Sequence, residues 1–136
     1  MLLGGSNCQL AAAKAVKAMG HRLVLADYLQ EPPAAALCDR HIQVSTFDVT
    51  GCIRAARENH VDGIFTVGTD QPVYTVARVA SALGLPAGIT EQTALCATNK
   101  RAMKAAFHQA GIPNAPHAFL RRGASVAALE SLAAPL

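Results

Sequence analysis

Three polar turns, each directly after a short apolar run, carry the residues of this chain best suited to bind a small ligand. They are Gly4–Gln9, Asp27 and Gly68–Asp70. Amides, hydroxyls and carboxylates of this kind bind polar ligands through hydrogen bonds. If the apolar runs are parallel strands, the three turns meet at the carboxyl edge of one sheet, where such sheets bind their ligands. The spacing therefore predicts a binding site at that edge, although these residues contain no convincing catalytic set.

The first turn matches a dinucleotide-binding fingerprint only in part. With Gly4 as the first glycine of GxGxxG, Ser6 and Gln9 stand where the second and third glycines belong. Asp27 lies about 20 residues further on, at the place of an acid that binds ribose. The two missing glycines argue against NAD. Asn7 and Gln9 instead offer side-chain amides at the mouth of the sheet, and the alternative for Asn7 is that it only caps the following helix.

Two charged residues also have two interpretations each. Asp70 either caps the helix that begins near Pro72 or holds a substrate amine or hydroxyl at the end of its strand. Lys100 falls in the first turn of an expected helix, where a cation opposes the helix dipole. This placement hints at a nearby anion, and the plainer interpretation is a solvated lysine.

Apolar runs alternate with helix-like segments through the first two thirds of the chain. Strands are expected at 1–3, 21–26, 42–45, 61–67 and just after Gly84, and helices at 10–19, 49–59 and 72–83. Thr46, Phe47 and Asp48 include the cap of the second helix. Strands separated by helices predict an α/β fold, a Rossmann-like doubly wound parallel sheet of about five strands.

The pattern changes after Ala87. Helices are expected at 91–97, at 99–110 with Thr98 as the N-cap, and at 126–132 after Ser125, with a short strand at 118–120. These expected elements have no sheet of their own to pack against. We therefore expect one domain over residues 1–95 and the beginning of a second over 96–136.

Composition narrows the classes of function. Of 136 residues, 51% are hydrophobic and 15% are charged, and the formal net charge is +3 with scattered Lys and Arg, which gives little support for binding nucleic acid. No run reaches the roughly 18 apolar residues of a membrane span. The four cysteines and five histidines have no metal-ligand spacing, so we expect free thiols, no metal site and a cytoplasmic location.

Four segments together resemble a known family. They are LLGGSNCQL at 2–10, GHRLVLAD at 20–27, VDGIFTVGTD at 61–70 and the span from Asn99-Lys100 to Gly111-Ile112-Pro113, which is the most specific. In this order they resemble the N-terminal part of ATP-grasp enzymes, above all carbamoyl-phosphate-synthase-like and biotin-carboxylase-like members. The resemblance covers essentially the whole chain. It implies a pre-ATP-grasp domain at 1–95 and the first elements of a truncated ATP-grasp domain at 96–136.

The resemblance also implies a chemistry. Enzymes of this family use ATP and Mg²⁺ to activate a carboxylate as an acyl phosphate, which an amine, a thiol or a similar nucleophile then attacks. By this match Lys100 contacts ATP phosphate. The residues implied to contact substrate are Gly5, Ser6, Asn7, Gln9, Asp27, Thr69 and Asp70. No residue is assigned to catalysis.

The chain departs from the family in one respect. The second ATP lysine, the glycine-rich lid and the metal-binding Glu and Asn residues of the family would all lie beyond Leu136. We therefore expect a fragment, a truncated gene product or one subunit of a split enzyme, inactive alone and with no cofactor firmly expected for this chain by itself. Its expected partners are a small carboxylate substrate and the rest of an ATP-grasp domain, in cis or in trans.

Two other functions stay open at this point. One is a standalone Rossmann-like module that binds a nucleotide or another small ligand. The other is a structural or interaction role through the edge of the sheet or the C-terminal tail, including formation of a homodimer.

Overall fold

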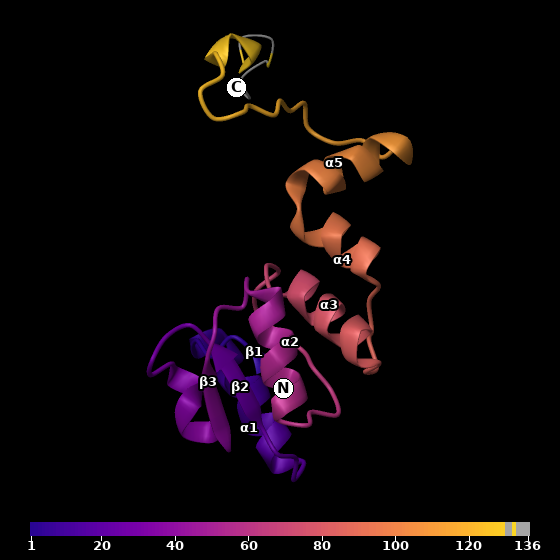
Figure 1. Cartoon of the computed structure of the whole chain (residues 1–136). Coiled ribbons are helices and arrows are strands. Elements are labelled where there is room, and N and C mark those ends of the chain that lie inside the picture. Colours follow the sequence, from indigo (N-terminus) through magenta and orange to yellow (C-terminus); the bar gives the residue numbers. More distant parts are fainter. Residues whose placement is uncertain (130–131, 133–136) are drawn as a thin grey trace.

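A computed structural model describes residues 1–129 and 132 of the chain (Figure 1). The elements in order are β1 (Leu2–Leu3), the 3-10 helix η1 (Asn7–Gln9), α1 (Leu10–Ala18), β2 (Val24–Asp27), the 3-10 helix η2 (Pro33–Leu37), β3 (Arg40–Gln43), α2 (Val49–Glu58), α3 (Val73–Leu83), α4 (Glu91–Thr98), α5 (Lys100–Gln109) and the 3-10 helix η3 (Val126–Leu129). None of the helices in these ranges has the length and apolar character that a membrane crossing requires.

The strands form a parallel sheet in the order β1-β2-β3. Leu2 pairs with Leu25, and β2 pairs with β3 along its whole length from Val24 to Asp27. Phe65 forms a parallel bridge to Leu2 on the free side of β1. Helices lie between consecutive strands, as an α/β fold requires. The prediction of an α/β fold with a parallel sheet is confirmed.

The prediction of about five strands is wrong in its count. The segment expected as the fourth strand contributes only the bridge at Phe65, because β1 has just two residues before the chain turns at Gly4, which has a φ of +93°. No strand forms near Leu85 within the described residues. Pro86 has no N–H to donate to a neighbouring strand, which weakens pairing there.

The core lies on both faces of the sheet. On one face the strands pack against α2 and α3. The buried residues of this cluster include Leu3, Val24 and Ala26 of the strands, Cys52, Ala55 and Ala56 of α2, and Val79 and Ala80 of α3. On the other face Leu2, Leu23 and Leu25 pack with Ala13 of α1 and Ala34 of η2. Neighbouring residues of a strand point to opposite faces, so a strand covered on both sides is apolar throughout. All four residues of β2 are buried for this reason.

The chain leaves the sheet after α3. Helix α4 packs on α3 and α5 packs on α4, and Figure 1 shows this arm extending away from the strands. Asn99, rather than the predicted Thr98, caps α5, since its side-chain oxygen accepts hydrogen bonds from the N–H groups of Arg101 and Ala102. Helix α5 has no buried residue.

The expected elements near the C-terminus are only partly present. Residues 118–120 do not form the expected strand. The expected helix at 126–132 is the short 3-10 helix η3, which begins where the Ser125 hydroxyl accepts a hydrogen bond from the Ala127 N–H. Part of that predicted helix, residues 130 and 131, lies outside the described residues.

A tightly packed glycine in the first turn of helix α2, Gly51, gives a test of the fold. Asp48 caps α2, because its Oδ1 accepts a hydrogen bond from the Gly51 N–H at 2.9 Å. A Cβ added at Gly51 would collide with the Asp48 carboxylate and lie 2.7 Å from Cγ2 of Val44. We expect Gly51→Ala to lower the free energy of unfolding by about 1–3 kcal/mol, despite the better helix propensity of alanine.

Urea denaturation followed by circular dichroism measures this loss. Gly88→Ala is the matched control, because nothing lies within 4 Å of a Cβ added at Gly88. A Gly51→Ala variant as stable as the control would contradict the close packing at the start of α2.

Candidate functional site

The three predicted turns do meet at the carboxyl edge of the sheet. The first loop, Gly4–Gln9, leaves β1 with the Gly4 N–H bonded to the Ala26 carbonyl at the end of β2. Gly5 lies against its neighbours so closely that an added Cβ would be 2.9 Å from Cβ of Pro32. The backbone at this position therefore requires glycine.

Asp27 holds the first loop in place. The residue is 6% exposed, and Oδ2 accepts a hydrogen bond from the Gly5 N–H at 2.7 Å while Oδ1 accepts one from the Leu29 N–H at 2.8 Å. Hydrogen bonds to a charged acceptor are stronger than neutral ones. The structure thus gives Asp27 a positioning role, and its predicted contact with substrate stays a prediction.

Gln9 joins the first loop to the turn after Phe65. Its side chain is 1% exposed, its Nε2 donates a hydrogen bond to the Val67 carbonyl at 2.7 Å, and its Oε1 accepts one from the Ser6 hydroxyl. A Cβ at Gly4 would lie 3.5 Å from the Gln9 amide. The first loop therefore packs on the side chain of its own glutamine, Gln9.

A fourth segment, Thr46 to Asp48, also lies at this edge. Its residues were predicted only as candidate helix caps. Thr46 follows β3, and its hydroxyl donates a hydrogen bond to Oε1 of Gln71 at 3.2 Å. The buried Thr75 hydroxyl donates one to the Thr46 carbonyl at 2.7 Å. Ligands bind beyond the carboxyl ends of parallel strands. Because Thr46 directly follows the expected strand at 42–45, this rule could have predicted Thr46 as part of the site.

The side chains that remain free at the edge are polar and aromatic. Asn7, Thr69 and Asp70 are exposed, and no hydrogen bond of their side chains occurs within the described part of the chain. Neither Asn7 nor Asp70 caps the helix that follows it, because neither η1, α1 nor α3 has a side-chain cap. Two aromatic residues not predicted for the site, Tyr28 after β2 and Phe47 after β3, are 65% and 73% exposed.

Lys100 lies apart from these residues. It is the exposed first residue of α5, which reaches the sheet only through α4 and α3. Ion pairs in the described ranges join Lys17 to Asp39 and Arg78 to Glu91, so Lys100 takes no part in them. An exposed ammonium that takes no part in an ion pair suits a phosphate group, although the neighbouring N–H groups of Arg101 and Ala102 are bonded to the Asn99 side chain.

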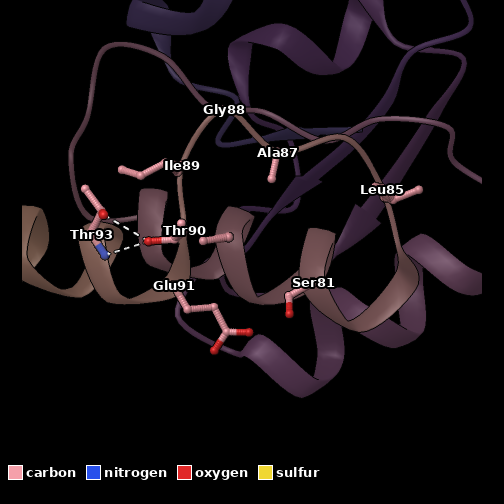
Figure 2. A pocket seen from close by; sticks show the side chains of 9 residues that line it. Ser81, Leu85, Ala87, Gly88, Ile89, Thr90, Glu91 and Thr93 are labelled. Atoms are coloured by element: carbon pink, nitrogen blue, oxygen red, sulfur yellow. Dashed lines mark hydrogen bonds between the residues drawn. The ribbon is translucent and has the colours of Figure 1, made fainter.

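A cavity of about 510 Å³ lies between α3, α4 and the segment that joins them, and Figure 2 draws the side chains that line it. Thr90 caps α4 there through a hydrogen bond from the Thr93 N–H at 3.1 Å. Glu91, the charged residue of this lining, is paired with Arg78 at 3.2 Å. None of the predicted site residues lines this cavity, so we do not assign the binding site to it.

The described residues contain no group of three or more His, Cys, Asp or Glu side chains that could hold a metal ion. What the carboxyl edge offers is a rigid backbone with exposed amide, hydroxyl, carboxylate and aromatic groups. Groups of these kinds are suited to hydrogen bonds with a polar ligand.

Solved structures share this arrangement. Phosphoribosylglycinamide synthetase from Anaerococcus prevotii superposes with a TM-score of 0.74 and 25% identity, over 98% of this chain and 34% of that one. L-amino acid ligase from Bacillus licheniformis gives 0.68 and 23%, over 98% and 35%. N5-carboxyaminoimidazole ribonucleotide synthetase from Thermotoga maritima gives 0.64 and 19%, over 85% and 31%. The chain has the fold of the N-terminal region of ATP-grasp carboxylate–amine ligases.

The resemblance to ATP-grasp enzymes drawn from the sequence is thereby confirmed. The chain spans about a third of the length of these ATP-grasp proteins. No protein-family model and no curated protein matches the chain. The predicted boundary between domains at residues 95 and 96 and the predicted site residues stay predictions.

The two bonds to Asp27 give a test of how the edge is held. We expect Asp27→Asn to lower the free energy of unfolding by about 1–3 kcal/mol, because an amide keeps the shape but turns one acceptor into a donor that faces a backbone N–H. Asp70→Asn, at the exposed turn, should change it by less than about 0.5 kcal/mol.

Thermal and urea denaturation of the two variants measure the difference. Amide hydrogen exchange of Gly5 and Leu29 should also become faster in Asp27→Asn alone. If both variants were equally stable and exchanged equally slowly, Asp27 would not be what holds the first loop.

Proposed function

We propose that this chain forms the substrate-facing N-terminal part of an ATP-dependent carboxylate–amine ligase that works through an acyl phosphate. The observation that carries the proposal is the carboxyl edge, where Gln9 of the first loop bonds to the Val67 carbonyl, directly before the turn Gly68–Asp70. The edge presents free polar side chains on a fold shared with ATP-grasp ligases. A carboxylate–thiol ligase would use the same edge.

In this proposal, exposed side chains at the edge contact the ligand, and buried side chains hold the edge in place. The exposed hydroxyl of Thr69 and the amide of Asn7 supply neutral donors and acceptors, and the Asp70 carboxylate suits an amine. Gln9 and Asp27 position the loops of the edge without contacting the ligand, because their side chains are buried and hydrogen-bonded within the edge. Gly5 also supports the edge from inside, because its N–H bonds to Asp27 and its carbonyl accepts a hydrogen bond from the Ala34 N–H, whereas the exposed Ser6 keeps its predicted contact with substrate. Catalytic groups belong to the rest of the ligase in this proposal.

The ATP site of this proposal lies at the other end of the chain. Lys100 would contact a phosphate group, and its free, exposed ammonium at the start of α5 fits that role. When bound, ATP with Mg²⁺ would supply the phosphoryl group that activates the carboxylate. As the resemblance to ATP-grasp enzymes implies, we assign the Mg²⁺ ligands, together with the second ATP lysine and the lid, to a further part of the ATP-grasp domain, in cis or in trans.

The names of similar structures suggest which ligands to test. Two of them are synthetases of phosphoribosylglycinamide and of N5-carboxyaminoimidazole ribonucleotide, and a third is an L-amino acid ligase. Phosphorylated ribosyl amines and L-amino acids are therefore the first candidates for the carboxyl edge. All four cysteines are free thiols, which fits the cytoplasmic location that we propose.

The exposed thiol of Cys8 reports on this edge. Cys8 lies in the first loop, and a Cβ at Gly68 would be 2.9 Å from its Cβ. We expect phosphoribosylglycinamide or an L-amino acid, at four times its dissociation constant, to slow alkylation of Cys8 by iodoacetamide about fivefold, because only the free protein reacts. Peptide mass spectrometry measures the rates, with Cys96 on α4 as the internal control.

Matched variants locate the protection. Asp70→Asn should weaken protection by an amine, whereas Asp62→Asn, before Phe65 at the opposite end of the sheet, should not. Equal slowing of Cys8 and Cys96, or no protection by either class of probe, would contradict a substrate site at the carboxyl edge.

A separate experiment tests whether this chain catalyses ligation without the rest of an ATP-grasp domain. We expect the 136-residue chain with ATP, Mg²⁺, a carboxylate and an amine to release phosphate no faster than a blank without protein. Phosphoribosylglycinamide synthetase from Anaerococcus prevotii, with its own substrates, is the positive control for the assay. Phosphate release by the chain that depends on both carboxylate and amine, and that is lost in Lys100→Met, would show that the chain catalyses ligation by itself.

A further inference from the structure

The turns at the carboxyl edge carry acids and no basic residue. They are residues 4–9, 28–31, 44–48 and 66–71, and none of these turns contains a Lys, an Arg or a His. Glu31, Asp48 and Asp70 are exposed in them. A surface with charge of one sign attracts a ligand of the opposite sign and disfavours one of its own sign. The edge therefore suits the amine substrate of a ligase better than a phosphate or a free carboxylate.

Large apolar and aromatic side chains are exposed at the same edge. Residues 1–111 expose five of them, and only Met19, at the end of α1, lies elsewhere. The other four follow the ends of β2 and β3 or the bridge at Phe65: Tyr28, Leu29, Phe47 and Val67. Exposed apolar groups that are bordered by polar ones mark binding sites. The edge thus offers apolar contact as well as negative charge.

The backbone that carries Phe47 is held in a turn. The Asp48 N–H bonds to the Ser45 carbonyl at 2.9 Å, and the Phe47 N–H donates a hydrogen bond to the Ser45 hydroxyl at 3.2 Å. The ring of Phe47 is nevertheless 73% exposed. A ring on a fixed backbone loses little conformational freedom when a ligand packs on it.

This turn adjoins the turn that carries Asp70. The Thr46 hydroxyl donates a hydrogen bond to Oε1 of Gln71 at 3.2 Å. Phe47 follows Thr46 in the chain, and Asp70 precedes Gln71. The exposed ring and the exposed carboxylate therefore belong to two turns that are bonded to each other.

Tyr28 lies where the chain leaves the sheet toward Phe47. Its carbonyl accepts a hydrogen bond from Nε2 of Gln43, the last residue of β3, at 3.1 Å. The Val44 N–H, next in the chain, bonds to the Asp27 carbonyl at 3.1 Å. Tyr28 is 65% exposed, so a second ring is available at this part of the edge.

We propose that Phe47, together with Tyr28, makes the carboxyl edge specific for a primary amine that carries an aromatic ring and no phosphate group. The proposal rests on the ligase function proposed above and names the class of its amine substrate. The ammonium group pairs with Asp70. The ring of the substrate packs on the rings of Phe47 and Tyr28, in the offset or edge-to-face contacts that aromatic groups prefer.

The probe is 2-phenylethylamine, which has the ring and the ammonium group alone. Titration of the ¹⁵N-labelled 136-residue chain, followed by NMR, should shift the amide signals of residues 28–29, 45–48 and 68–71 and leave those of residues 59–64 unchanged. Ethylamine, which lacks the ring, should bind about tenfold more weakly. 2-Phenylethanol, which lacks the charge, should bind about fivefold more weakly, as expected for the loss of an exposed ion pair.

Variants assign the specificity to the rings. Phe47→Ala should weaken binding of 2-phenylethylamine about tenfold and leave the affinity for ethylamine unchanged. Phe119→Ala, the same exchange at a 43% exposed ring beyond α5, should leave both affinities unchanged. Tyr28→Ala should weaken binding of 2-phenylethylamine severalfold, and Tyr28→Phe should retain it. Because these rings are exposed, the variants should melt within a few degrees of the unchanged chain.

Three results would overturn the proposal. They are equal affinities for 2-phenylethylamine and ethylamine, equal losses in Phe47→Ala and Phe119→Ala, and tighter binding of phosphoribosylglycinamide than of 2-phenylethylamine. Each of them would leave the ligase function standing with another amine as its substrate. The ligase function itself fails on a different observation, which is that neither phosphoribosylglycinamide nor any L-amino acid protects Cys8 from iodoacetamide.

Discussion

The buried carboxylate of Asp27 is the interaction on which the carboxyl edge depends. It ends β2 and binds the backbone N–H groups of Gly5 and Leu29, so one side chain fixes both the first loop and the chain that leaves the second strand. The approach is close enough that Gly5 has no room for a Cβ beside Pro32 and Leu25. A buried carboxylate is stable only when donors satisfy it, and here the backbone supplies them.

A series of hydrogen bonds connects the other segments of this edge to the first loop. Gln9 bonds to the Val67 carbonyl, the turn that follows reaches Gln71, and Gln71 bonds to Thr46 after β3. Each contact joins segments at least 25 residues apart. The result is an edge whose buried polar groups bond to one another and whose exposed groups remain available to a ligand, an arrangement that lowers the entropic cost of binding.

The two edges of the sheet differ in how well they satisfy their own groups. At the carboxyl edge Asp27, Gln9 and Thr75 all have partners. At the amino edge Asn59 keeps an unbonded oxygen and His60 a strained backbone. The carboxyl edge is therefore the one whose buried polar groups are satisfied within the protein.

The sequence by itself determined the α/β class, the edge where the turns meet, a cap for α2 among Thr46, Phe47 and Asp48, and the resemblance to ATP-grasp enzymes, because apolar periodicity, turn residues and local motifs are properties of neighbouring residues. Only the tertiary structure decided that Asp27 points inward, that Thr46 joins the edge and that the fourth strand shrinks to a bridge at Phe65. It alone also brought the turn that carries Phe47 to the turn that carries Asp70. Those outcomes depend on distances between segments far apart in the chain, and no local pattern encodes such distances.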